Sequence, residues 1–343
     1  MLFSLVEMKS NQNLLTNEYS KLVSNIKQIL EQGRNKAYQS INHVLTKTYW
    51  DVGRQIVEFE QGGKKRAGYG ERILKTLSKE LIDEFGKGFS LTNLKQMKSF
   101  YLIYSKGQKV SDLLFKLSWS HYVRLMTIKN SDERKFYEIE CEKNSWSLRE
   151  LNRQFDSALF ERLVLSKDKE GVRELSQKGQ LVEKAEDALK EPYVLEFLGL
   201  EESCKYSEGE LETAIISNLE GFLLELGRGF TFVARQKRIT NKSEHYFIDL
   251  VFYNRLLKCF FLIDLKIGKL THQDLGQMQM YVNYFDREIK EDDENKTIGV
   301  VLSKENNKFV VEYTLPKDIQ VYAKQYQLYL PKKEELIKQI SGL

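Results

Sequence analysis

The chain has 343 residues, of which 41% are hydrophobic and 30% charged, a composition typical of a globular protein. Its 53 basic and 49 acidic residues leave a net charge of +4, which neither requires nor excludes a nucleic-acid partner. Three widely spaced cysteines without a C-x-x-C pair exclude a zinc ribbon and a disulfide framework. No apolar run reaches the roughly 18 residues that span a bilayer, so we expect a cytoplasmic protein without a membrane partner.

The N-terminal half has the pattern of a helical domain. Its apolar residues recur at spacings of three and four, and no proline precedes Pro192. We predict an all-α domain over residues 15–165 and a charged connector over residues 166–190, where large aromatic residues are scarce. The sequence leaves open whether this domain serves DNA binding, partner binding, dimerisation or a purely structural role.

Within that domain, two helices are predicted over residues 69–85 and 91–104, around a short glycine-containing turn, with Ser90 as the N-cap of the second helix. Read as a helix-turn-helix, the second helix would present Lys95 and Lys98 to DNA phosphates. An ordinary helical hairpin with a solvated polar face is the alternative, and it fits the pattern better.

The pattern changes after Tyr206, in a second domain predicted over residues 191–343. Ser207 and Glu210 form a capping box at the start of an amphipathic helix that runs to residue 226. The elements expected after it are strands over residues 230–239, 245–253 and 257–266, a helix over 272–290, strands over 298–302 and 309–313, and a helix after Pro331. This order predicts an α/β (α+β) fold. The second and third strands are apolar at nearly every position, so both faces of the sheet should be covered.

Two carboxylates and a lysine interrupt these apolar strands. Asp249 lies in Phe-Ile-Asp-Leu-Val-Phe, and Asp264 and Lys266 lie in Phe-Leu-Ile-Asp-Leu-Lys. If the hairpin turns about the bond between residues 256 and 257, Asp249 faces Asp264, and Lys266 shares their side of the sheet. Facing carboxylates destabilise a sheet unless positive charge lies beside them, so this pattern predicts a metal site next to the lysine. The alternative is a hairpin salt bridge with no catalytic purpose.

A third acid, Glu212, falls on the apolar face of the preceding helix, by which that helix should pack on the sheet. Three oxygen ligands favour Mg²⁺, with Mn²⁺ as a substitute, and the absence of nearby paired histidines or cysteines disfavours zinc. Lys266 would orient the attacking water and offset charge on a phosphate. No glycine-rich phosphate loop is present, so we expect no nucleotide cofactor.

In this motif order, residues 206–313 resemble the PD-(D/E)XK nuclease superfamily, which has an αβββαβ restriction-endonuclease-like core. The segments 222–230, 248–254, 264–269 and 276–281 resemble the bacterial YhcG-type proteins, and this similarity extends over nearly the whole chain. The resemblance implies catalytic roles for Glu212, Asp249, Asp264, Lys266 and Gln277, with Gln277 positioning the lysine or the DNA backbone. Ile248 replaces the proline of the motif, a departure that leaves the ligands intact.

We therefore expect a Mg²⁺-dependent endonuclease that cleaves DNA, with Asp249, Asp264 and Glu212 as metal ligands. Lys269 follows the motif lysine and would contact a phosphate, with an ordinary surface lysine as the alternative. A homodimer is compatible with the helical N-terminal domain. The competing interpretation is a catalytically silent nucleic-acid-binding or assembly protein that retains the nuclease fold.

Overall fold

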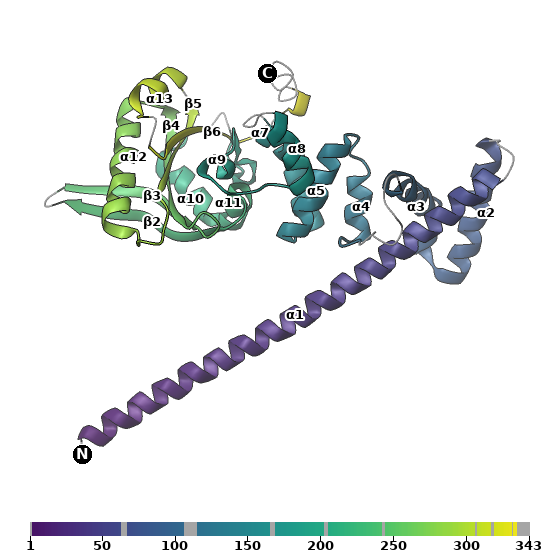
Figure 1. The fold of residues 1–343 in the computed structure, drawn as a ribbon, viewed down its shortest axis with the longest axis horizontal. Coiled ribbons are helices and arrows are strands. Elements are labelled where there is room, and N and C mark those ends of the chain that lie inside the picture. Colours follow the sequence, from purple (N-terminus) through teal and green to yellow (C-terminus); the bar gives the residue numbers. More distant parts are fainter. Residues whose placement is uncertain are drawn as a thin grey trace. The chain divides into compact units, whose positions relative to one another are not determined.

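The computed structural model describes residues 2–62, 67–105, 115–164, 169–201, 205–241, 244–305, 307–316, 319–330 and 332–334. The chain divides into two compact units, Met1–Lys129 and Asn130–Leu343, which we describe separately (Figure 1). Among the described residues, no helix is both long enough and apolar enough to cross a membrane.

The first unit is entirely helical in its described part. Its elements are α1 (Leu2–Gly62), α2 (Ala67–Phe85), the short 3₁₀ helix η1 (Lys87–Phe89), α3 (Leu91–Tyr104) and α4 (Trp119–Leu125). The two helices predicted around the glycine turn are confirmed, and the Ser90 side chain accepts the backbone N–H of Asn93 as an N-cap. Trp50, Met97 and Phe100 are buried where the C-terminal part of α1 packs on α3.

Gly53 sets the closest approach of α1 and α3. A Cβ atom at this position would overlap the backbone carbonyl of Met97. We expect Gly53→Ala to force the helices apart and to cost about 1–3 kcal/mol in the free energy of unfolding. Urea unfolding followed by circular dichroism measures this, with Gly276→Ala on an open helix surface as control. Equal stabilities of the two variants would contradict the close approach.

The second unit begins with helices and continues into a mixed sheet. Its helices are α5 (Ser131–Asn144), α6 (Leu148–Asp156), α7 (Leu159–Val164), α8 (Lys169–Lys178), α9 (Ala185–Ala188), η3 (Glu196–Leu198), α10 (Glu208–Ser217), α11 (Leu219–Leu226), α12 (His272–Tyr284), the π-helical turn η4 (Phe285–Ile289) and α13 (Lys308–Thr314). The strands are β1 (Tyr193–Val194), β2 (Phe230–Asn241), β3 (Glu244–Asn254), β4 (Cys259–Lys269), β5 (Ile298–Glu305) and β6 (Val321–Gln327).

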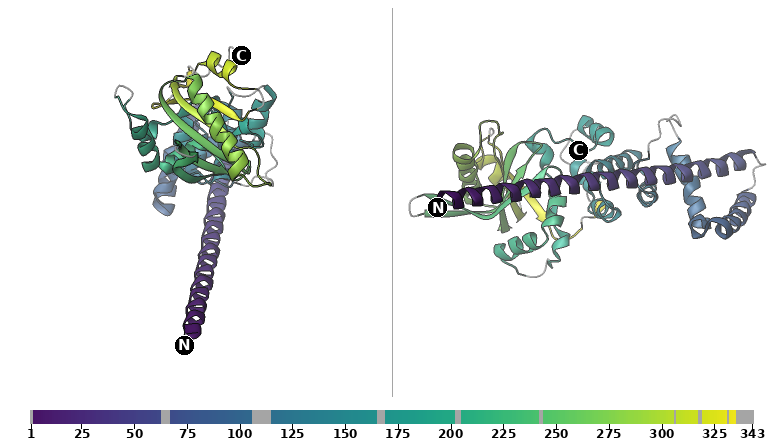
Figure 2. Two further views of the ribbon diagram at one scale, coloured as in Figure 1. Left: turned by 90° about the vertical axis from the view of Figure 1, so that its left-hand side faces the viewer. Right: turned by 90° about the horizontal axis from the view of Figure 1, so that it is seen from below.

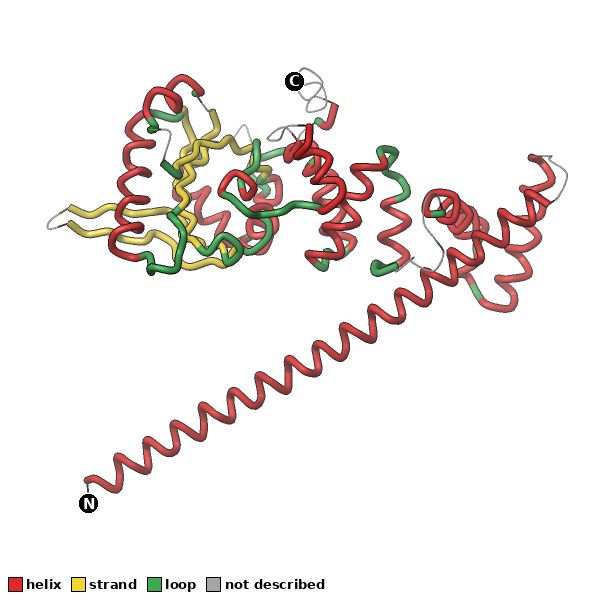
Figure 3. The backbone as a smooth tube through the Cα atoms, in the orientation of Figure 1, coloured by secondary structure: helices red, strands yellow, loops and turns green. Residues whose placement is uncertain are grey.

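The strands, yellow in Figure 3, form one sheet. Their order is β1-β6-β5-β4-β3-β2. Strands β2, β3 and β4 form an antiparallel meander, and β5, β6 and β1 continue the sheet in parallel. Helices α10 and α11 cover one face through Leu211 and Phe222, and α12 covers the other through Met278 and Val282. The predicted fold class, with both sheet faces covered, is confirmed.

Three details differ from the predicted elements. The helix expected over 207–226 is two helices, because the backbone leaves helical geometry at Asn218. Residues 309–313 form helix α13 and not a strand, since the Asn307 side chain accepts the N–H groups of Phe309 and Val310 and caps a helix there. Strand β6 was not anticipated, and the helix expected after Pro331 lies outside the described residues except for 332–334.

Helices α6 and α7 pack with the sheet domain through a buried ion-pair network. Glu225 on α11 and Arg162 on α7 are both fully buried, and Arg162 Nη1 lies 2.5 Å from Glu225 Oε1. Arg153 Nη2 lies 3.3 Å from Glu225 Oε2, and Lys190 donates to the Glu225 carbonyl. Glu225 is buried because α6 and α7 cover this side of α11. Residues 130–164, which precede the expected connector at 166–190, therefore pack with the sheet domain and belong to the second unit.

Candidate active site

The two aspartates lie where β3 and β4 separate. The paired residues Leu250–Ile263 to Asn254–Cys259 have the register expected from a turn between residues 256 and 257. Asp249 and Asp264 occupy the next position, at which the backbone ladder stops. There the Oδ2 atom of Asp249 accepts the N–H of Leu265 at 2.8 Å, in place of a strand carbonyl. The side chain of one aspartate thus ends the strand pairing at the candidate site.

Asp264 is almost fully buried, at 3% exposure, and lies beside a second carboxylate. Burial raises the pKa of both aspartates, and the charge of Asp249 raises that of Asp264 further, to about 7. The Oδ2 atom of Asp264 lies 2.9 Å from Lys266 Nζ, yet no donor among the described residues reaches it with hydrogen-bond geometry. This buried oxygen therefore has capacity for a further positive partner.

Lys266 connects the aspartates to helix α10. Its ammonium lies 2.9 Å from Asp264 and 3.4 Å from Oε2 of Glu208 in the first turn of α10. Burial disfavours the charged form of Lys266, but Asp264 and Glu208 outweigh burial and raise its pKa. The lysine is therefore held protonated beside the buried carboxylate.

Glu212 is joined to Asp249 through a residue that the sequence did not single out. Gln236 Nε2 donates to Glu212 Oε2 at 2.7 Å and to Asp249 Oδ1 at 2.9 Å, while Arg235 Nε lies 2.6 Å from Glu212 Oε1. Gln236 adopts a left-handed backbone conformation, with φ of 46°, which is uncommon for a residue other than glycine. A single glutamine in a strand has no sequence signal that marks it as a site residue, so Gln236 is identified only from the fold.

Gln277 reaches the site through Tyr281, one turn further along α12. The Tyr281 hydroxyl donates to the carbonyl of Phe247 at 3.0 Å, and the Gln277 side chain lies beside it. Burial, followed by the charges of Asp264 and Asp249, raises the pKa of Tyr281 to about 12, so the hydroxyl lies within electrostatic range of both acids. Gln279, two residues after Gln277, lines a shallow hollow on the outer surface of α12.

The three candidate phosphate-binding lysines all lie beside carboxylates. Lys269 is 80% exposed at the end of β4, with its Nζ 3.6 Å from Glu305. Lys95 and Lys98 belong to α3 of the first unit, where their Nζ atoms lie 3.9 Å from Glu71 and 2.5 Å from Glu60.

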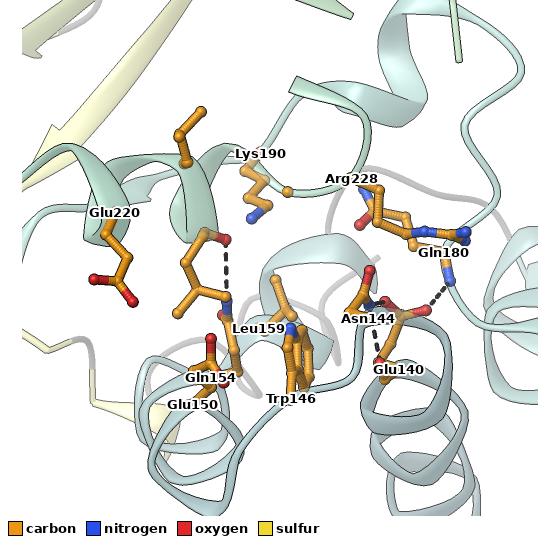
Figure 4. A pocket seen from close by; sticks show the side chains of 13 residues that line it. Glu140, Asn144, Trp146, Glu150, Gln154, Leu159, Gln180, Lys190, Glu220 and Arg228 are labelled. Atoms are coloured by element: carbon orange, nitrogen blue, oxygen red, sulfur yellow. Dashed lines mark hydrogen bonds between the residues drawn. The ribbon is translucent and has the colours of Figure 1, made fainter. Parts of the chain in front are cut away.

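A separate cavity of about 260 Å³ lies in the second unit, between α5, α6 and α11 (Figure 4). Gln154 donates across it to the carbonyl of Leu224 at 3.1 Å, and Glu140 accepts from the Gln180 N–H at 2.7 Å and from Asn144 at 2.8 Å. None of the candidate catalytic residues lines it. We therefore assign it to the packing of helices on the sheet domain.

The order of helix, three antiparallel strands, helix and parallel strand, with acids on β3 and β4 and a lysine two residues after the second acid, defines a restriction-endonuclease-like fold. Residues 186–341 match the model of the YhcG PDDEXK nuclease domain, and residues 25–162 match the DUF1016 N-terminal domain. YhcG of Escherichia coli (strain K12) is 36% identical over 363 aligned positions, which cover 97% of this chain and 96% of the relative. The chain belongs to the YhcG family.

Similarity to solved structures is partial. A repair endonuclease from Pyrococcus abyssi aligns with 38% of this chain and 50% of its own, at 16% identity and a TM-score of 0.26. The EndoMS–dsDNA2 complex aligns with 39% of this chain and 50% of its own, at the same identity and TM-score. The alignments thus span about half the length of these neighbours.

Proposed function

We propose that the nuclease domain is a Mg²⁺-dependent endonuclease that hydrolyses phosphodiester bonds in DNA. The observation that carries the proposal is the buried pair of Asp249 and Asp264 at the point where β3 and β4 separate, with the Lys266 ammonium 2.9 Å from Asp264. Two facing acids cost stability in the free protein, and such a cost is expected at functional sites. Membership of a nuclease family supports the same conclusion.

The donor set fits a hard divalent cation. Asp249 and Asp264 supply carboxylate oxygens, and the buried Oδ2 of Asp264 has the Lys266 ammonium 2.9 Å away but accepts no hydrogen bond of ordinary geometry within the described residues. Glu212 would be the third ligand, although Arg235 and Gln236 hold both its oxygens, and no cluster of three acidic, histidine or cysteine side chains close enough for a metal occurs in the described part of the chain. When bound, the ion would polarise the phosphate and lower the pKa of the attacking water.

The protein groups around the acids have separate tasks in this proposal. Lys266 remains protonated and stabilises the negative charge that develops on the phosphate. Tyr281, beside Gln277, fixes α12 against the carbonyl of Phe247 and so holds β3, the strand that carries Asp249, in place. Gln236 keeps Glu212 and Asp249 together by donating one hydrogen bond to each.

DNA contact is proposed for the surface next to these acids. Strands β2 and β3 form a hairpin that extends past the rest of the sheet (Figure 1). Lys237 and Arg238 on β2 are exposed. Lys269 lies exposed at the end of β4. Lysine and arginine at such positions attract the phosphate backbone without reading sequence. Lys95 and Lys98 of the first unit would contribute further phosphate contacts once DNA competes with their carboxylate partners.

Gln236→Ala is expected to lower cleavage roughly 10- to 100-fold, because loss of a residue that orients a ligand typically has this effect. Mn²⁺ affinity, measured by electron paramagnetic resonance, should fall in parallel. Gln236→Gly, which tolerates the left-handed backbone, should behave in the same way. Gln273→Ala on the exposed start of α12 is the control. Unchanged Mn²⁺ affinity in both Gln236 variants would exclude the bridging role.

The test of the proposed function is an activity panel with the full-length protein. Supercoiled plasmid, linear duplex, single-stranded DNA and RNA are incubated with Mg²⁺, Mn²⁺ or EDTA. We expect nicking of duplex DNA that needs the divalent ion and disappears in Lys266→Ala. A protein that binds DNA with steep salt dependence and cuts none of the substrates would instead be a silent binding module, and faster cleavage of RNA would overturn the proposed substrate.

A further inference from the structure

Helix α1 carries a stripe of apolar residues that no described part of the first unit buries. The apolar stripe comprises Tyr19, Leu22, Ile26, Leu30, Gly33, Ala37, Ile41 and Val44. Its six large side chains are 67%, 54%, 47%, 59%, 56% and 63% exposed, in chain order. Isolated exposed apolar residues are ordinary, but a continuous row of them marks an interaction surface.

The stripe faces away from the rest of its own unit. Trp50, Gly53 and Val57, which are buried, lie on roughly the opposite side of α1 at about 100° per residue. Trp50 stacks against Tyr101 of α3 there, with ring centroids 5.0 Å apart. Figures 1 and 2 show α1 continuing well past α2, α3 and α4 as one helix. The packing of the first unit therefore explains the C-terminal part of α1 but not the stripe.

The spacing of the stripe identifies its partner as another helix. Successive members are separated by 3, 4, 4, 3, 4, 4 and 3 residues, an eleven-residue repeat. Such a repeat keeps an apolar row on one side of a nearly straight helix and is the pattern of helices that pack lengthwise. From residue 19 to residue 44 the stripe is roughly 38 Å long, so its partner must be a helix of similar length.

The order of large and small members fits a second copy of the same helix. If two copies run antiparallel with facing residue numbers that sum to 63, every stripe position meets a stripe position. Leu30 then faces Gly33, Ile26 faces Ala37 and Leu22 faces Ile41. Large side chains thus fill the space above small ones, as in a well-packed interface. A parallel pair would set glycine against glycine and alanine against alanine, and would leave a gap at its centre.

The antiparallel contact is closed, because each copy presents the same apolar stripe to the other. A self-complementary contact of this kind produces a dimer and not a filament. We infer that the apolar stripe of α1 is a self-association surface through which two copies of this chain form an antiparallel dimer.

Analytical ultracentrifugation of the full-length protein tests the inference. We expect a dimer at micromolar concentration, and at least roughly 100-fold weaker association in the double variant Leu22→Glu, Ile41→Glu. The control is Gln28→Glu, Gln39→Glu, which adds the same charges on the opposite, exposed side of α1 and should leave the dimer intact. Near-ultraviolet circular dichroism should report an unchanged environment for Trp50 in both variants. A monomeric wild-type protein, or a dimer unaffected by the stripe charges, would overturn the inference.

Disulfide trapping tests the orientation, in a background with the three native cysteines replaced by serine. Mixing Leu22→Cys protein with Ile41→Cys protein should yield the crossed disulfide. Leu22→Cys alone should yield none, because its two copies lie roughly 28 Å apart along the antiparallel pair. A disulfide in Leu22→Cys alone, without the crossed product, would establish a parallel pair and refute the arrangement inferred here.

Discussion

Asp264→Asn is expected to abolish DNA cleavage and, in the same protein, to raise the free energy of unfolding. Asparagine keeps the shape of the side chain but removes a negative charge that is 3% exposed and faces Asp249. Without a divalent ion this removal should stabilise the fold by about 1–3 kcal/mol, since like charges no longer oppose each other. Cleavage should fall by roughly 10³-fold, because in the proposed site Asp264 supplies a metal-ligand oxygen as well as the partner of Lys266.

Urea unfolding in EDTA and plasmid nicking in Mg²⁺ measure the two effects on one preparation. Asp292→Asn removes a charge of the same kind from an exposed turn of the same unit, so it should change neither quantity. Loss of activity together with loss of stability would show that Asp264 is a structural residue whose removal merely unfolds the site.

The buried ion pair of Arg162 and Glu225 should be the most sensitive position for stability. Arg162→Met leaves Glu225 buried with weaker compensation, and we expect it to cost about 3–5 kcal/mol in the free energy of unfolding. The double variant Arg162→Met, Glu225→Leu should recover part of this loss, because an apolar pair needs no counter-charge. Glu220→Gln, on the exposed side of the same helix, is the control. A double variant less stable than Arg162→Met would contradict the explanation.

Acid should weaken the same network. Burial alone would raise the pKa of Glu225, but Arg162, Lys190 and Arg153 outweigh it and hold that pKa at about 2, below the ordinary 4.5. A carboxyl whose pKa is lower in the folded state stabilises the protein above pH 4.5, and this contribution disappears as the pH falls from 4.5 toward 2. Unfolding measured across that range should lose this slope in Glu225→Gln.

At the hairpin of β3 and β4, local sequence patterns predicted the strand register correctly. A turn at a known bond fixes which residues face each other, so the register that places Asp249 beside Asp264 followed from counting. The capping box at Ser207 likewise located the start of α10, because its hydrogen bonds join residues three apart.

Contacts between residues far apart in the sequence could not be predicted. The burial of Glu225 depends on the break between α10 and α11 at Asn218 and on an arginine 63 positions away, and local patterns reveal neither. Gln236 gave no sign in sequence, since its role depends on a left-handed backbone that brings one amide to two carboxylates. Residues 309–313 have the composition of a strand, and a single capping asparagine made them a helix.

The ion-pair network around Glu225 also limits which part of the chain could be transferred to another protein as a folded nuclease domain. A gene fragment beginning at residue 191 would encode the whole sheet and every candidate catalytic residue, but it would lack Arg153, Arg162 and Lys190. The resulting polypeptide would expose the surface of α11 that α6 and α7 cover, and Glu225 would lose its three cationic partners. Recombination that moved the catalytic part to another protein would have to move residues 130–190 as well. We therefore expect the helices before the sheet and the sheet itself to occur together in related proteins.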